Sequence, residues 1–366
     1  MIKYSVIVPF HSNFNLLTLC LDALCHTLDP AESEIIVVDN NAAGSQIPAA
    51  AEIKARCRII RKQENLMYPG AINLGAEAAR GDYLFFCDAD TCVAPRFHTA
   101  LVDALDGDGV GYAAAKLFDM GTQHLLEFGI TSSYYNFPHP FAGRPREFAL
   151  IQTDHMPLAA CAACSAIRKD LFLDLGGFDP ELVHSYSDID LSLRLLARGY
   201  VTICVADAQA YHCGSSTVGS GMGASLKEDT KGIFMQKHPR IPVQIGTYLD
   251  LACSQFLHQT ACDRRDYFVL DCATIANSAL YIDHVTDALG LSVVDQYRLP
   301  APGRDQASLD LLNFIPYQIR NYRTPLLYFT DSFLAFRGNG LWKSCRAGFG
   351  DIVLDRHANL ELLQTI

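Results

Sequence analysis

Two carboxylates stand two residues apart where an apolar run ends, in Asp88-Ala89-Asp90. The run before them, Tyr83 to Cys87, predicts a short strand that is buried on both faces. Ligands of open α/β sheets bind at the carboxyl ends of the strands, and paired carboxylates there suit Mg²⁺ or Mn²⁺. A lone Asp-x-Asp is more often an acidic turn, so the surrounding elements must decide between these two interpretations.

The first 60 residues predict the start of a parallel sheet. Ser5 to Pro9 is a strand closed by proline, and Ser12 or Asn13 can cap the leucine-rich helix that follows. A second buried strand, 34–40, ends in Asp39. An acidic residue at this position suits a ribose or a base, and a solvated turn residue is an equal alternative. A weakly marked helix at 47–56 and a strand at 57–60 are expected next.

A helix of small residues precedes the Asp-x-Asp strand. Pro69 suits its first turn, and Gly70 and Gly75 permit close approach to a neighbour. Asn73 is its candidate ligand contact, and Gly81 is expected to end it. This helix is expected to pack tightly on the sheet.

A second acidic pair, Asp188 and Asp190, opens a later helix that Gly199 stops. Ser187 or Asp188 is expected to begin this helix, and the spacing of Asp190 and Arg194 predicts an ion pair on one face. Between the two acidic pairs the sequence predicts further elements. They are a helix at 95–105, a strand at 110–116, a ribbon or loop at 118–155, a tightly packed strand at 158–167 and a helix at 169–175. A strand at 201–206 and a Gly/Ser-rich loop at 214–225 follow the second pair.

The composition is that of an ordinary globular protein, with 50% hydrophobic and 19% charged residues. The net charge of −11 speaks against non-specific binding of nucleic acid. All of this charge lies in residues 1–230, so the two parts of the chain are expected to do different work. The 13 cysteines have no framework spacing and favour a reducing cytosol. The apolar runs are too short for a transmembrane segment, and no signal peptide is expected at Met1 to Phe10.

Residues 231–366 predict helices and loops in which aromatic and basic side chains alternate. They are Phe314, Tyr317, Arg320, Tyr322, Arg323, Tyr328, Phe329, Phe333, Phe336, Arg337, Trp342, Lys343 and Arg346. One hypothesis is a binding surface for an anionic glycan, a lipid head group or a nucleic acid. An ordinary helical subdomain or a homodimer interface is at least as well supported.

Over residues 1–220 the chain resembles the family 2 glycosyltransferases, which have the GT-A fold. The matching motifs occur in family order. They are Ser5 to Pro9, Ile36 to Asn40, Asn65 to Gly75, Gly81 to Leu84 with Asp88 to Asp90, Gly176 to Asp179, Ser187 to Leu191 with Arg194 and Gly199-Tyr200, and His212 with Gly214 to Ser216.

The resemblance implies an α/β GT-A (Rossmann-like) fold, with an open, twisted, mostly parallel sheet flanked by helices. It implies a catalytic domain at 1–225, and the remaining 226–366 is expected to be a mainly helical extension for acceptor binding or oligomerisation. It also implies an inverting transfer of a hexosyl unit (EC 2.4) from a UDP-, GDP- or dTDP-sugar to the hydroxyl of a glycan, a lipid-linked molecule or another acceptor. Bacterial polysaccharide assembly, in the cytoplasm or at the inner face of the membrane, is the setting most typical of the family.

The resemblance also assigns roles to residues. Asp188 is the expected general base, and Asp88, Asp90 and His212 are the expected ligands of Mg²⁺ or Mn²⁺, with a loop histidine as the alternative for His212. The expected donor site comprises Pro9, Phe10, His11, Asp39, Asn65, Gly70, Asn73, Asp88, Ala89 and Asp90. The chain departs from the family pattern at Ser187, where the family usually has Glu.

Two rival functions are weighed against the transferase. A sugar-nucleotide pyrophosphorylase would carry a Gly-rich basic loop after its first strand, where this chain has Pro9 to Asn13. A non-catalytic nucleotide-sugar-binding protein would not need Asp88, Asp90 and Asp188 together.

Overall fold

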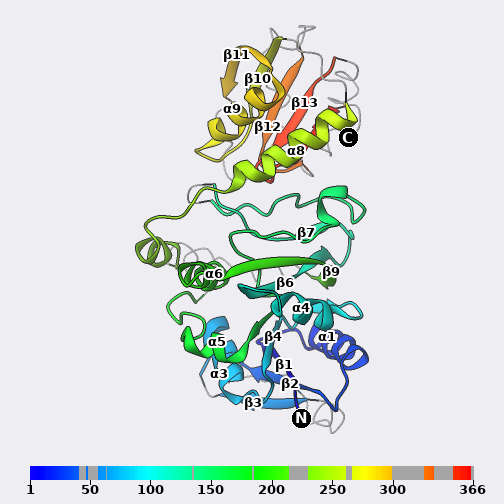
Figure 1. Cartoon of the computed structure of the whole chain (residues 1–366), viewed down its shortest axis with the longest axis vertical. Helices are drawn as coiled ribbons and strands as arrows, with labels where there is room; N and C mark the ends of the chain where they lie inside the picture. The colour runs from blue at the N-terminus through cyan, green and yellow to red at the C-terminus, as the bar shows by residue number, and fades with distance from the viewer. Residues whose placement is uncertain are drawn as a thin grey trace. The chain divides into compact units, whose positions relative to one another are not determined.

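The computed structural model describes residues 1–40, 47, 57–62, 64–133, 136–183, 185–213, 230–260, 266–298, 325–333 and 349–363. The chain forms two compact units (Figure 1). Unit 1 comprises Met1–Ile130 and Arg144–Ile241, and unit 2 comprises Thr131–Gly143 and Pro242–Ile366.

Unit 1 is built on a nine-stranded sheet in the order β3-β2-β1-β4-β8-β6-β9-β5, with β7 paired to β6. The strands are β1 (Tyr4–Phe10), β2 (Ser33–Asp39), β3 (Arg58–Arg61), β4 (Tyr83–Cys87), β5 (Thr91–Val93), β6 (Val110–Asp119), β7 (Leu125–Glu127), β8 (Cys164–Arg168) and β9 (Val201–His212). The first four strands in this order are parallel, β8 runs antiparallel to both its neighbours, and β6 and β9 are parallel. The predicted open α/β sheet is confirmed.

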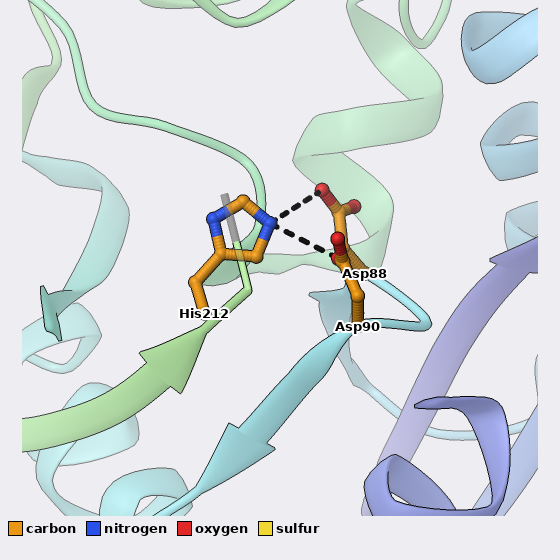
Figure 2. A group of neighbouring side chains, drawn as sticks. All are labelled: Asp88, Asp90 and His212. Atoms are coloured by element: carbon orange, nitrogen blue, oxygen red, sulfur yellow. Dashed lines mark hydrogen bonds and ion pairs between the residues drawn. The ribbon is translucent and has the colours of Figure 1, made fainter. Parts of the chain in front are cut away.

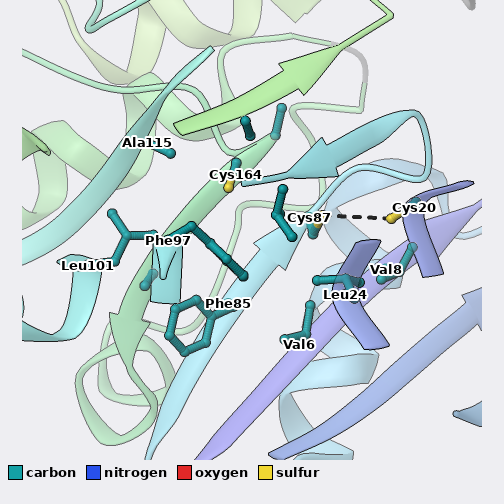
Figure 3. Close-up of a cluster of buried hydrophobic side chains, with 14 of the residues drawn as sticks. Val6, Val8, Cys20, Leu24, Phe85, Cys87, Phe97, Leu101, Ala115 and Cys164 are labelled. Carbon is teal, nitrogen blue, oxygen red and sulfur yellow. Dashed lines mark hydrogen bonds between the residues drawn. The ribbon is translucent and has the colours of Figure 1, made fainter. Parts of the chain in front are cut away.

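Helices cover both faces of this sheet. They are α1 (Phe14–Thr27), α3 (Met67–Ala78), α4 (Phe97–Leu105), α5 (Lys169–Asp174) and α6 (Ser187–Ala197), with a short 3₁₀ helix at Ala149–Ile151. Successive side chains of a strand point to opposite faces of the sheet, so each central strand packs against both layers of helices. Val6 and Phe85 enter the cluster that Leu24 of α1 and Leu101 of α4 complete (Figure 3).

The residues between these positions face the other layer of helices. Phe86 contacts Phe172 of α5, with ring centroids 5.1 Å apart. A Cβ on Gly75 of α3 would lie 2.4 Å from Cγ2 of Ile7, so this glycine allows the helix to approach β1. The prediction that Gly81 ends this helix is wrong. The helix ends at Ala78, and Gly81 is required because a Cβ there would lie 2.8 Å from the backbone of residues 3–5.

Unit 2 corrects the prediction of a mainly helical C-terminal part. Its described residues form a five-stranded sheet in the order β11-β10-β12-β13-β14. The strands are β10 (Asp266–Asp271), β11 (Ser292–Arg298), β12 (Leu326–Thr330), β13 (Ile352–Asp355) and β14 (Leu360–Leu362), and the helices are α8 (Ile245–Gln259) and α9 (Ser278–Leu289). All but β14 run parallel. The apolar runs in β10, β12 and β13 are typical of strands buried on both faces. Sequence reasoning did not predict these strands.

The segment Thr131–Gly143 belongs to unit 2 although unit 1 surrounds it in sequence. The backbone oxygen of Ser132 accepts from the amides of Gln244 and Ile245, where α8 begins. Farther along, the amide of Phe141 donates to the carbonyl oxygen of His357. Unit 2 therefore depends on a part of the chain that precedes it by about a hundred residues.

Some predictions fall outside the described residues. They concern the helix at 47–56 apart from residue 47, the loop at 214–225, and most of the aromatic and basic side chains between 314 and 346. Of that group Tyr328, Phe329 and Phe333 are described, and all three are buried in unit 2. Within the described ranges, no helix is long and apolar enough to cross a membrane, and the cysteines described are free thiols.

Candidate active site

The Asp-x-Asp turn joins β4 to β5. The amide of Thr91 donates to the carbonyl oxygen of Asp88 and closes the turn, and the amide of Asp88 donates to the carbonyl oxygen of Ala163. β5 then pairs with the end of β9, which aligns Thr91 with His212. Two segments that are about 120 residues apart in sequence thus bring an imidazole to the pair of carboxylates.

Asp88, Asp90 and His212 form a triad of potential metal ligands (Figure 2). Nε2 of His212 lies 3.0 Å from Oδ1 of Asp90 and 4.0 Å from Oδ2 of Asp88. One ligand atom of each residue lies within 4.8 Å of the other two. All three side chains are partly buried.

The charges of the triad are strongly coupled. Burial, helped by the nearby charge of Asp90, raises the pKa of Asp88 to about 6, although His212 and Tyr68 act in the opposite direction. Burial lowers the pKa of His212, but its hydrogen bond to Asp90 and the charges of both carboxylates outweigh this, so the net shift is upward. Two close carboxylates therefore call for a positive charge between them.

The triad fits a divalent cation. Oδ1 of Asp88 is buried and has no hydrogen-bond partner among the described residues, so it can serve as a ligand without giving up a bond. Two carboxylates suit Mg²⁺ and Mn²⁺, and the added imidazole suits a transition metal such as Mn²⁺ better than Mg²⁺.

A pocket of about 170 Å³ adjoins the triad. It is lined by Tyr68, Asp88, Cys161, Ala162, Ala163, Ser185, Tyr186, Ser187 and Asp188. Asp88 and Asp188, which are a hundred residues apart in sequence, thus line one cavity. Small side chains at 161–163 leave the space between them open.

Asp188 lies in the first turn of α6, where Oδ1 accepts a hydrogen bond from the amide of Ile189 at 2.9 Å. The helix begins at Ser187, as predicted. Tyr186 is the N-cap, with a left-handed φ of 71°, and its side chain makes no capping bond. This leaves the Asp188 side chain on the pocket wall.

Asp190 has a different role, as predicted. Its Oδ2 lies 2.7 Å from Nη2 of Arg194, and its Oδ1 lies 2.8 Å from Nε2 of His238. Burial raises its pKa, but His238 and Arg194 outweigh this and lower it below the ordinary value. Arg194 also donates to the carbonyl oxygens of Leu175 and Gly177. Asp190 therefore anchors α6 to the glycine turn.

Asn73 has a partner that sequence alone did not reveal. Its Nδ2 donates to the carbonyl oxygen of Phe178 at 2.7 Å, and its Oδ1 accepts from the amide of the same residue at 2.8 Å. Gly177 has a φ of 74°, and a Cβ there would lie 2.4 Å from Oδ1 of Asn73. Asn73 thus holds this turn, and its contact with a ligand stays a prediction.

Other predicted donor-site residues lie along the carboxyl edge of β1 and β2. Phe10 is paired with Asp39, next to Pro9 in the register of β1 and β2. His11 follows as an exposed residue. Asp39 is buried, and its Oδ2 lies 3.2 Å from Nε of Arg61.

The remaining predicted residues lie near the triad or on α3. Ala89 lies between the two carboxylates in the turn. Oδ1 of Asn65 accepts from the amide of Met67, and Gly70 lies in the first turn of α3, where a Cβ would be 3.0 Å from Cβ of Leu66. Asn65 and Gly70 therefore shape the helix start.

Of the residues that line the pocket, sequence reasoning assigned only Asp88 and Asp188 to the site. Tyr68, Cys161 and Tyr186 are among those that it missed. The segment 161–163 was predicted as strand, but β8 begins only at Cys164. Tyr186 precedes the predicted helix by one residue, and only its positive φ distinguishes it. Tyr68 carries no sequence signal beyond its position in the motif from Asn65 to Gly75.

The comparisons with known proteins concern the family and the fold. Residues 5–175 match the family model "Glycosyl transferase family 2". The chain is 30% identical over 221 residues to the O-antigen biosynthesis protein RfbC of Myxococcus xanthus, a match that covers 57% of this chain and 17% of that protein. It is 27% identical over 228 residues to the uncharacterized protein y4gI of Sinorhizobium fredii, covering 59% of this chain and 25% of that one. The chain thus spans a quarter or less of these relatives.

A solved structure supports the fold. The crystal structure of GalNAc-T7 with UDP, GalNAc and Mn²⁺ superposes with a TM-score of 0.52 at 14% identity, covering 80% of this chain and 55% of that one. The described sheet and helices of unit 1 are those of the GT-A fold. With the motif order and the family match over residues 5–175, unit 1 of this chain belongs to glycosyltransferase family 2.

Proposed function

We propose that this chain transfers a hexosyl unit from a nucleotide diphosphate sugar to an acceptor hydroxyl, with inversion at the anomeric carbon. The observation that carries the proposal is the single pocket lined by both Asp88 and Asp188, beside the triad that Asp90 and His212 complete. An inverting transfer needs a base and a leaving-group site on opposite sides of one sugar, and these two acids offer both.

The triad residues bind the diphosphate end of the donor. Mn²⁺ or Mg²⁺ held by Asp90 and His212, with Asp88, would neutralise the charge that develops on the departing diphosphate. Ala89 and the carboxyl edge formed by Pro9, Phe10, His11 and Asp39 hold the nucleoside of a UDP-, GDP- or dTDP-sugar.

Asp188 acts as the general base. It accepts the proton of the acceptor hydroxyl as that oxygen attacks the anomeric carbon from the side away from the diphosphate. Only a side chain that reaches the pocket can do this, which Asp188 does and Asp190, bound to Arg194 and His238, does not.

The setting we propose is the assembly of a bacterial polysaccharide or glycoconjugate, in the cytoplasm or at the inner face of the membrane. The name of the Myxococcus relative, an O-antigen biosynthesis protein, supports it. The acceptor is then a glycan or a lipid-linked molecule. Unit 2 binds that acceptor or a second copy of the chain.

Asp188→Asn tests the base. This variant should lose nearly all transfer, about 100-fold or more, and still bind donor and Mn²⁺ in calorimetry. Asp170→Asn is the control, because Asp170 is an exposed acid in the first turn of α5 and lies away from the pocket. Near-normal turnover by Asp188→Asn would refute the assignment.

The same assays separate the rivals. A wild-type chain that binds nucleotide sugars with Mn²⁺ but neither transfers nor hydrolyses them is a binding protein. Formation of a nucleoside triphosphate from the donor and pyrophosphate would instead identify a pyrophosphorylase.

A further inference from the structure

The Tyr68 hydroxyl is a buried polar group that the catalytic scheme above does not use. It lies in the pocket wall and, in the part of the chain that the structure describes, makes no hydrogen bond of ordinary length and angle, although it is near enough to Asp88 to lower the pKa of that carboxyl. Two other tyrosines of unit 1 have partners: the hydroxyl of Tyr112 donates to Oγ of Ser165 at 2.7 Å, and that of Tyr83 donates to Oδ1 of Asp106 at 2.6 Å. A buried hydroxyl without a partner costs about 1–3 kcal/mol, so a ligand that supplies the partner recovers that cost.

The backbone holds Tyr68 in this position at the cost of strain. Met67, directly before it, has a φ of 54°, a left-handed conformation that costs a residue with a side chain about 1–2 kcal/mol. Two asparagines hold this conformation. Oδ1 of Asn65 accepts from the amide of Met67, and Nδ2 of Asn40 donates to its carbonyl oxygen. Strain that is fixed in this way is typical of residues aimed at a ligand.

The ring of Tyr68 is held as well. It packs against Phe178, with the ring centroids 6.0 Å apart, and Asn73 bonds both backbone polar groups of Phe178. The ring therefore cannot turn its hydroxyl toward another partner without breaking this packing.

The pocket selects the chemistry of the group that meets Tyr68. On its other wall Asp188 disfavours an anionic group in this part of the pocket, whereas Asp88 would help to hold the cation that binds the diphosphate. Its volume of about 170 Å³ is several times the ~30 Å³ of one water molecule, enough for a small neutral ring. A sugar hydroxyl both donates and accepts, so it can donate to a carboxylate while it accepts from Tyr68.

We propose that the Tyr68 hydroxyl donates a hydrogen bond to a hydroxyl of the transferred sugar and so selects donors that carry a hydroxyl at that carbon. This inference rests on the proposed function, because the pocket between Asp88 and Asp188 must hold the transferred unit. A deoxy sugar would leave the phenol buried and unpaired, and a site built for a hydroxyl rejects the analogue that lacks it.

The experiment compares nucleotides with and without their sugar. UDP, GDP and dTDP, and the glucose, N-acetylglucosamine and mannose esters that exist for each, are titrated with Mn²⁺ into the wild-type chain by calorimetry. The dissociation constant of the nucleotide diphosphate divided by that of the nucleotide sugar measures how much the sugar adds to affinity. Tyr68→Phe should lower this ratio about 10-fold for the preferred donor and leave the nucleotide diphosphate unchanged.

Tyr83→Phe is the matched control, because its hydroxyl is bonded to Asp106 and does not line the pocket. It should leave the ratio unchanged. Thermal melting of both variants shows whether either substitution affects the fold. A deoxygenated form of the preferred donor should bind wild type and Tyr68→Phe almost equally.

The outcomes separate a failure of the role of Tyr68 from a failure of the proposed function. If Tyr68→Phe binds both ligand classes as wild type does, the role of Tyr68 is refuted while the proposed function stands. If it weakens the nucleotide diphosphate as much as the nucleotide sugar, Tyr68 has only a structural role and the inference is again refuted. If the wild-type chain binds none of the nucleotide sugars, the proposed function fails, and this inference fails with it.

Discussion

His357 should make unit 2 sensitive to mild acid. Its Nδ1 lies 3.0 Å from the carbonyl oxygen of His139, and Nε of Arg356 donates to its Nε2 at 3.3 Å. Because a guanidinium can only donate, Nε2 must be the unprotonated nitrogen. A second proton would place two positive charges in contact. Burial, with the nearby His139 and Arg356, accordingly lowers the pKa of His357 from 6.5 to about 3.

The magnitude follows from proton linkage. A pKa that is depressed in the folded state contributes stability that is fully present above the unfolded value of 6.5 and is lost as the pH falls toward about 3. At about pH 5 the unfolded chain is almost fully protonated at this residue and the folded chain is not, which lowers the free energy of unfolding by about 2 kcal/mol relative to about pH 7.5. A folded pKa one unit higher would change this figure little, because about pH 5 would still lie above it.

The variant His357→Asn isolates this effect. Nδ2 of asparagine can take the position of Nδ1 and still donate to His139, but it does not titrate. Urea unfolding followed by circular dichroism at about pH 7.5 and about pH 5 gives the stability change for each chain. The wild type should lose about 2 kcal/mol more than the variant, and His258→Asn, at an exposed residue of α8 in the same unit, should behave as wild type. Equal losses in wild type and His357→Asn would refute the reasoning.

Two further predictions concern unit 1. Asp90→Ala removes the carboxylate that lies 3.0 Å from His212 and should weaken Mn²⁺ binding at least ~10-fold in calorimetry, whereas the exposed Asp82→Ala should not; unchanged affinity would exclude the triad as the metal site. Gly81→Ala forces a Cβ to within 2.8 Å of backbone atoms of β1 and should lower the free energy of unfolding by about 2–3 kcal/mol in urea. Gly232→Ala is its control, because a Cβ on Gly232 would meet open space. If Gly81→Ala unfolded at the same urea concentration as the wild type, the packing argument would be contradicted.

Much of unit 1 could be predicted because its signals are local. The strand before Asp88 is a continuous apolar run, and β4 has the predicted bounds, Tyr83–Cys87. The helix pair of Asp190 and Arg194 follows from spacing alone and is present. These features need only the periodicity of one element.

Other features depended on partners that are far away in sequence. β5 has three residues and is a strand only because Thr91 pairs with His212. β9 was expected to end at Ala206, yet pairing with β5 and β6 carries it to His212. The strands of unit 2 were missed because short apolar runs suit a buried helix as well as a strand, and only their pairing decides.

The two acids of α6 show where sequence reasoning gained from helix geometry. Residues two apart on a helix point away from each other, so Asp188 and Asp190 cannot share a site. Arg194 and His238 take one of them, which leaves the other to the pocket. Asp190 also supports the pocket indirectly. Its partner Arg194 donates to the carbonyl oxygen of Gly177, and the next residue, Phe178, packs against the ring of Tyr68. Breaking the ion pair of Asp190 and Arg194 should therefore disturb both the α6 wall with Asp188 and the wall with Tyr68. It would remove neither of these two side chains.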